Sequence, residues 1–237
     1  MSPGIGTRFR RLPFCDRLLL LVIGGWSIFG LLDNYFVRHD PTYGGGPFRG
    51  LSSIFIWAAI AGTIAYSLIW QQRRPATYGI SFNLGGVASL AVLAVIHVYL
   101  LISGKFVLSP TDSFVWGAVG AFMEELAFRA IAIDRFILLM EGVENKVFWA
   151  ILASSALWSV PHITSKSLSQ LVGGIFIGGL FFGYVYYKSR SILLTAWIHG
   201  VANVGYPGGV LIAALYCVIS FADWTIWTWN KPKQGLR

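Results

Sequence analysis

Apolar residues gather in long stretches along this chain, and short polar turns separate one stretch from the next. A bilayer core about 30 Å thick is crossed by roughly 20 apolar residues in a helix. Each stretch therefore predicts a membrane-spanning helix. The eight predicted spans are 18–37, 51–70, 82–104, 114–139, 147–165, 168–187, 191–206 and 207–227. The last two leave almost no loop between them, so seven spans are the alternative.

Composition supports this interpretation, because 56% of the 237 residues are hydrophobic and only 12% are charged. Soluble domains carry about twice that share of charged residues. Eight short-looped spans use nearly the whole length, which leaves no room for a soluble domain. We therefore predict an all-α, polytopic transmembrane helical bundle that forms a single integral membrane domain over residues 1–237.

The formal net charge of +8 does not indicate nucleic-acid binding, because the basic residues lie in small groups between apolar runs and form no basic face. Lysine and arginine accumulate on the cytoplasmic side of membrane proteins. With the N-terminus inside, thirteen of the eighteen lie in cytoplasmic segments, four lie on the other side and Arg129 lies within a span. The pattern predicts that both termini are cytoplasmic.

Two adjacent carboxylates, Glu124 and Glu125, lie about ten residues into the predicted span 114–139. An ionisable side chain within a bilayer costs at least a few kcal/mol and is usually paired or functional. Glu125 and Arg129 are four residues apart and can pair on one helix face. Glu124 has no partner on its own helix, which suits a general base. The alternative is a structural ion pair beside a protonated Glu124 in a polar cavity.

Two later spans carry imidazoles. His162 follows Trp158 by four residues, and Pro161 interrupts the helix between them and frees a backbone carbonyl. His199 and Asn203 are four residues apart on one helix face, and both can donate hydrogen bonds to an oxyanion. Each pair, taken alone, is also compatible with hydrogen bonding at a helix end or between helices.

No serine nucleophile motif, helical HExxH motif or reactive cysteine is recognisable, so the polar set favours attack by a water molecule. The cysteines Cys15 and Cys217 lie far apart and predict two unpaired thiols. His97 has no companion motif, and we expect a structural hydrogen bond there.

In order and spacing, these motifs resemble those of the CPBP intramembrane proteases, which include the eukaryotic CAAX prenyl endopeptidase and many bacterial relatives. The family pattern is EExxFR, then an aromatic residue with histidine four residues later, then HxxxN, each on a separate span. All three occur here within residues 114–206. The resemblance implies a protease core over this range in an intramembrane endopeptidase, with Glu125 and Arg129 holding the site.

The resemblance also implies that Glu124 and His162 activate the hydrolytic water, while His199 and Asn203 stabilise the oxyanion. A zinc enzyme would instead use Glu124, His162 and His199 as ligands, because three protein ligands and a water are the usual catalytic arrangement. The metal-free mechanism uses the same residues through hydrogen bonds, and the sequence leaves both open.

The expected partners are the lipid bilayer and a hydrophobic or lipidated peptide or protein substrate, with no nucleic acid. The compact chain suggests a multi-pass protein of a bacterial cell membrane. Two other functions compete with proteolysis. One is a non-proteolytic membrane scaffold that binds other membrane proteins, and the other is a proton-coupled transporter that uses Glu124 as a relay. The transporter is disfavoured because the chain has no visible internal repeat.

Overall fold

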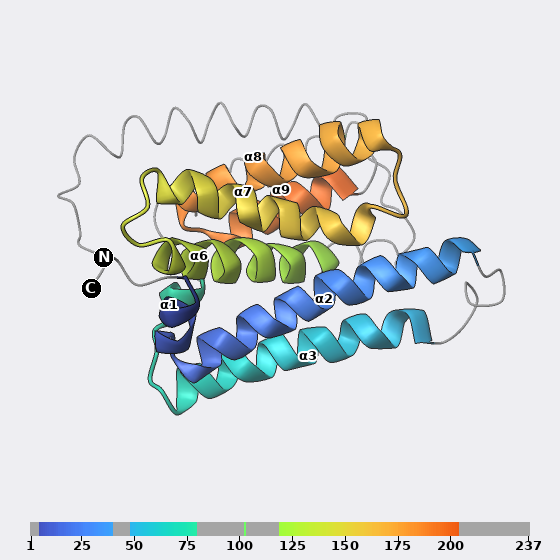
Figure 1. Cartoon of the computed structure of the whole chain (residues 1–237). Coiled ribbons are helices and arrows are strands. Elements are labelled where there is room, and N and C mark those ends of the chain that lie inside the picture. Colours follow the sequence, from blue (N-terminus) through green and yellow to red (C-terminus); the bar gives the residue numbers. More distant parts are fainter. Residues whose placement is uncertain (1–4, 40–47, 80–101, 103–118, 204–237) are drawn as a thin grey trace.

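The computed structural model describes residues 5–39, 48–79, 102 and 119–203, and every element in these ranges is helical (Figure 1). The first three helices are α1 (Ile5–Arg11), α2 (Phe14–His39) and α3 (Phe48–Ile69), and a 3₁₀ turn follows at Pro75–Tyr78. One long helix covers 119–139, with a π-helical stretch at Leu126–Ile133 before α6 (Asp134–Leu139). The remaining elements are α7 (Lys146–Ser159), the 3₁₀ turn Val160–His162, the π-helical stretch Gln170–Phe176, α8 (Ile177–Ser189) and α9 (Ile192–Asn203).

The predicted all-α class is confirmed for the described residues, and six of the eight predicted spans coincide with helices. The other two, 82–104 and 207–227, lie outside the described residues apart from residue 102, and His97 and Cys217 lie outside them as well. Two described helices, Phe14–Phe36 and Gln170–Ser189, are long and apolar enough to cross a membrane. The number of spans and the orientation of the termini stay predictions.

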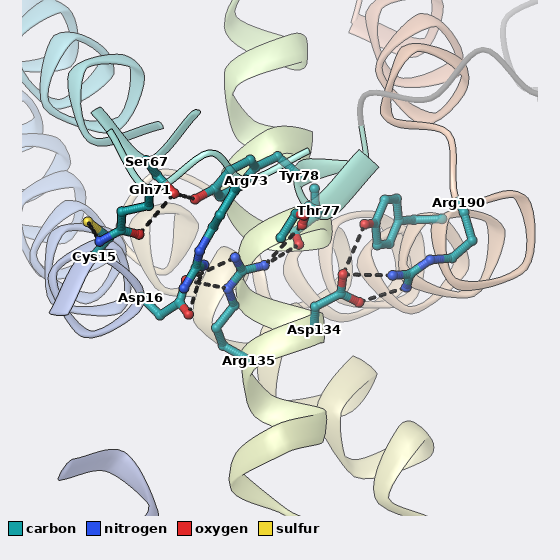
Figure 2. A network of polar contacts seen from close by, with 12 residues as sticks. Cys15, Asp16, Ser67, Gln71, Arg73, Thr77, Tyr78, Asp134, Arg135 and Arg190 are labelled. Carbon is teal, nitrogen blue, oxygen red and sulfur yellow. Dashed lines mark hydrogen bonds and ion pairs between the residues drawn. The ribbon is translucent and has the colours of Figure 1, made fainter. Parts of the chain in front are cut away.

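A network of ionic contacts ties the helices together at one end of the bundle (Figure 2). Asp16, near the start of α2, is buried and pairs with Arg73 at 2.8 Å and with Arg135 at 3.0 Å. Asp134 pairs with Arg190, just after α8, at 2.7 Å. Because a buried carboxylate must be paired, these contacts fix the start of α2 against the loop after α3 and against α6.

Gly79 follows the 3₁₀ turn at Pro75–Tyr78 directly and contacts the first residue of α9. Its φ of 69° is a left-handed conformation that favours glycine. A Cβ atom here would lie 2.7 Å from Cε2 of Tyr186. The Gly79 carbonyl accepts a hydrogen bond of 3.0 Å from the backbone N–H of Ile192, so this contact sets where α9 begins.

Helix α8 approaches α7 closely because glycines line its inner face. A Cβ atom on Gly183 would lie 2.8 Å from Cγ2 of Ile151, and one on Gly179 would lie 3.0 Å from Cε3 of Trp158. Small residues permit such close backbone approach between helices. The two glycines therefore bring α8 against the part of α7 that carries Trp158.

Helix α2 contacts the turn that follows the C-terminal end of α7. The Asn34 side chain donates a 2.6 Å hydrogen bond to the carbonyl of Pro161, and Arg38 donates one of 2.8 Å to the carbonyl of Thr164. A Cβ atom on Gly30 would lie 2.9 Å from Cβ of Pro161. The turn that carries His162 is thus held against the last third of α2.

The ionic network predicts a stability effect. Asp16→Ala leaves the guanidinium groups of Arg73 and Arg135 without their shared carboxylate. Removal of one partner of a buried ion pair costs about 3–5 kcal/mol, and we expect about 3 kcal/mol because Arg73 is partly exposed. The measurement is denaturant unfolding of the purified protein in detergent. The control is Glu144→Ala in the exposed turn before α7, and equal stability of the two variants would contradict the assignment.

Candidate active site

Glu125 lies at the centre of the candidate site and has no exposed surface. Its Oε2 lies 3.3 Å from Nε of Arg129, which confirms the predicted i,i+4 ion pair. Its Oε1 accepts a 2.9 Å hydrogen bond from Nδ1 of His199, on α9. Because a carboxylate can only accept, Nδ1 carries the proton, and Nε2 is the free nitrogen of the ring.

Arg129 is wholly buried, and its guanidinium lies 4.7 Å from the ring centroid of Trp158. Such a position over an aromatic face is a favourable cation–π geometry. Among the described residues, neither terminal nitrogen of Arg129 has a hydrogen-bond partner. The charge of Arg129 is therefore balanced by Glu125 and by the π face of Trp158.

The backbone becomes π-helical immediately after Glu125, over Leu126–Ile133. A π-helix bonds each N–H to the fifth carbonyl before it and is frequent at functional sites. Within this stretch the carbonyl of Phe128 accepts a hydrogen bond from the hydroxyl of Ser154 on α7. The Phe128 ring contacts Trp26 of α2, with centroids 5.4 Å apart. The helix 119–139, which carries Glu124, Glu125 and Arg129 and is called the motif helix below, is thus fixed on two sides.

Glu124 lies beside Glu125 but in a different environment. Its Oε2 accepts a 2.7 Å hydrogen bond from the indole N–H of Trp158 and lies 3.9 Å from Nε2 of His199. Its side chain is 27% exposed, whereas that of Glu125 is fully buried. Glu124 is therefore the accessible carboxylate of the pair, as a general base requires.

His162 ends the 3₁₀ turn that follows α7. Its ring packs edge-on against Trp158, with centroids 5.8 Å apart, and it lies within electrostatic reach of Glu124 and His199. The ring of His199 is itself stacked on Phe182 at 5.1 Å and meets Trp158 edge-on at 5.4 Å. Aromatic side chains from α7 and α8 thus fix the positions of both imidazoles.

Comparison with known proteins gives one family match. Residues 107–205 match the model of a family described as type II CAAX prenyl endopeptidase Rce1-like. We call residues 107–205 the Rce1-like segment. The match confirms the family resemblance predicted from the three motifs. No curated protein and no solved structure matches the chain.

The Rce1-like family is one of membrane-embedded peptidases, so the match supports a CAAX-protease-like intramembrane peptidase. The described part of the Rce1-like segment, residues 119–203, contains all the side chains of the cluster above. Five of the six predicted site residues meet there: Glu124, Glu125, Arg129, His162 and His199. Asn203 is the last residue of α9, and its side chain lies outside the described part of the structure.

The zinc interpretation required Glu124, His162 and His199 as ligands. Within residues 5–39, 48–79 and 119–203, no group of three His, Cys, Asp or Glu side chains is arranged to hold a metal ion. In this arrangement Oε2 of Glu124 accepts the Trp158 N–H, and Nδ1 of His199 donates to Glu125. These two contacts leave Oε1 of Glu124 and Nε2 of His199 open, so the zinc interpretation stays a prediction, and the mechanism below is proposed without a metal.

Trp158 is the site residue whose role the sequence did not predict. It contacts four members of the cluster through one side chain: the indole N–H bonds Glu124, the ring face covers Arg129, and the ring packs against both histidines. The sequence pattern required only an aromatic residue four positions before His162. The available signal was that tryptophan, unlike phenylalanine, carries a buried N–H that needs an acceptor.

The buried ion pair of the Rce1-like segment yields a second stability prediction. Glu125→Gln leaves Arg129 charged and buried without a counter-ion, which costs about 3–5 kcal/mol. The double variant Glu125→Gln with Arg129→Met removes both charges, so we expect it to be more stable than Glu125→Gln alone. Denaturant unfolding in detergent measures both. A single variant as stable as the wild type, or a double variant less stable than the single, would be incompatible with this role.

Proposed function

We propose that the protein is an intramembrane endopeptidase that hydrolyses peptide bonds of hydrophobic or lipidated substrates by attack of an activated water. The observation that carries this proposal is the position of Glu124, which is partly exposed and lies between the Trp158 N–H and Nε2 of His199. A carboxylate in this position can take a proton from water while an imidazole nitrogen faces the reacting carbonyl. We further propose that it is a multi-pass protein of a bacterial cell membrane.

Glu124 and His162 activate the water. Oε2 of Glu124 accepts the hydrogen bond from the indole N–H of Trp158, which leaves Oε1 to accept the proton of a water molecule. His162, within electrostatic reach of Glu124, accepts or donates the second hydrogen bond that orients this water. The water oxygen attacks the carbonyl carbon of the substrate, its proton passes to Glu124, and the π electrons of the carbonyl move to its oxygen.

His199 stabilises the oxyanion that forms in this step. Nδ1 of His199 donates to Glu125, so Nε2 is the atom that can donate to the oxyanion when the ring is doubly protonated. The Glu125 carboxylate stabilises that positive charge, as the carboxylate partner of a catalytic histidine does in other hydrolases. Asn203 supplies a second donor, as the family resemblance implies.

The second half of the reaction returns the site to its starting state. The oxyanion re-forms the carbonyl, the C–N bond breaks, and Glu124 gives its proton to the leaving nitrogen. The products are a carboxylic acid and an amine, and the net reaction consumes one water. Glu125 and Arg129 exchange no proton in this scheme and serve to hold His199 and the motif helix.

Removal of the base tests the mechanism. A general base contributes about 10²- to 10⁴-fold to a rate, so we expect Glu124→Gln to lower kcat by this factor and His162→Ala to lower it by at least about 10²-fold. Cleavage of a peptide library by purified protein measures the effect. The thermal transition of each variant, measured in parallel, separates lost chemistry from lost folding. Cleavage at wild-type rates in both variants would refute the proposal.

The same assay with and without a chelator tests the metal-free scheme. We expect full activity after chelation and dialysis, because no step above requires a metal ion. Loss of activity on chelation, with recovery on addition of Zn²⁺, would overturn the scheme in favour of a zinc peptidase that uses the same residues.

Trp158→Phe tests the proposed role of the indole N–H. Phenylalanine keeps a ring near Arg129 and His199 but removes the donor to Glu124. A hydrogen bond to a charged group contributes about 1.5–3 kcal/mol, so we expect kcat/KM to fall about tenfold or more. Trp149→Phe is the matched control, because Trp149 is on the same helix and is exposed. Equal kcat/KM in the two variants would contradict the role.

A further inference from the structure

The described helices form a bundle with two ends, and the two ends differ in their number of basic residues. The ion pairs of Asp16 with Arg73 and Arg135, and of Asp134 with Arg190, lie at one of them, which we call the basic end (Figure 2). The opposite end, which we call the far end, contains the last turns of α2 and the turn after α7 (Figure 1).

Among the described residues, ten lysines and arginines belong to the basic end and three to the far end. Those of the basic end are Arg8, Arg10, Arg11, Arg17, Arg73, Arg74, Arg135, Lys146, Lys188 and Arg190. Those of the far end are Arg38, Arg49 and Lys166. Because lysine and arginine are enriched on the cytoplasmic side, this difference assigns the basic end to the cytoplasm.

The candidate site is displaced from the basic end. Glu124 precedes Asp134 by ten residues, which is about 15 Å along a helix and places Glu124 near the middle of a bilayer core about 30 Å thick. Pro161, beside His162, contacts Asn34, which follows Asp16 by eighteen residues or about 27 Å. His162 therefore lies toward the far end of the described helices.

The described side chains between the site and the basic end are closely packed. Ile131, Ile133, Tyr186 and Ile198 each expose 1% of their surface or less. Within the same cluster Glu124 is partly exposed, and Ile163, directly after His162 at the far end, is half exposed. The partly exposed carboxylate and the exposed residues after His162 are therefore the accessible part of the described cluster.

We propose that the site takes its substrate from the non-cytoplasmic side of the membrane, as a peptide segment presented at the outer surface or at the outer end of a hydrophobic helix. This inference rests on the proposed peptidase function for its substrate, but its orientation does not depend on catalysis. It assigns the role of cytoplasmic anchor to the basic end and the role of substrate entry to the turn His162–Lys166.

Single cysteines on the two sides of α7 test the orientation. Ser165→Cys, in the exposed turn after His162, and Glu144→Cys, in the exposed turn before α7, are made in a chain that carries Cys15→Ser and Cys217→Ser. Intact cells of a bacterial expression host are treated with a membrane-impermeant maleimide, and detergent-permeabilised cells give the full labelling of each variant. We expect Ser165→Cys to be labelled in intact cells and Glu144→Cys only after permeabilisation. The reverse pattern, or labelling of both in intact cells, would overturn the proposal.

Cleavage after labelling tests whether the far end is the entry. Each variant is purified, divided, and assayed on the peptide library with and without a bulky maleimide on its cysteine. We expect modification at Ser165→Cys to lower kcat/KM at least about tenfold and modification at Glu144→Cys to leave it unchanged. The reverse result would place the entry at the basic end. An enzyme that cuts no peptide, but labels as expected, would refute the proposed function and leave the orientation supported.

Discussion

The site depends on one buried carboxylate, Glu125, which is held between Arg129 of its own helix and His199 of α9. An ionised carboxylate without exposed surface costs several kcal/mol unless its charge is paired and its oxygens are bonded. Movement of α9 relative to the motif helix would remove one of the two partners. Glu125 therefore fixes the register of two helices that are far apart in the sequence. It also turns Nε2 of His199 toward Glu124, so that a structural requirement sets the orientation of a proposed catalytic group.

The aromatic part of the site follows from the packing of α8 on α7. Gly179 and Gly183 allow α8 to approach until Trp158 and Ile151 fill the space that side chains would otherwise occupy. That approach places Phe182 against the ring of His199. Two residues without side chains thus determine where the aromatic rings lie. The imidazole is held by rings on two sides, which limits its rotation without adding a charge to the site.

The sequence predicted the features that depend on local helix geometry. The Glu125–Arg129 pair could be predicted because residues four apart share a helix face, and most helices could be predicted from the length of their apolar runs. The contact of Glu124 with Trp158 could not, because periodicity says which residues share a face but not how two helices rotate against each other. The π-helical stretch after Glu125 was likewise not predicted, because no recognised sequence signal marks the shift in backbone hydrogen bonding. The role of Asn203, the orientation of the chain and the spans 82–104 and 207–227 stay predictions.

Two adjacent glutamates can perform different tasks only if their surroundings differ, and Trp158 creates that difference. Its ring face covers Arg129, on the Glu125 side, while its N–H contacts Glu124. Glu125 is thereby kept in a dry ion pair that can support the structure, and Glu124 is kept in partial contact with the exterior, where it can meet water. Catalytic carboxylate pairs commonly divide acid–base and electrostatic roles through such a contrast in environment. In this protein a single indole bonds Glu124 through its N–H and covers Arg129, the partner of Glu125, with its ring face, so one side chain contacts both the proposed base and its support.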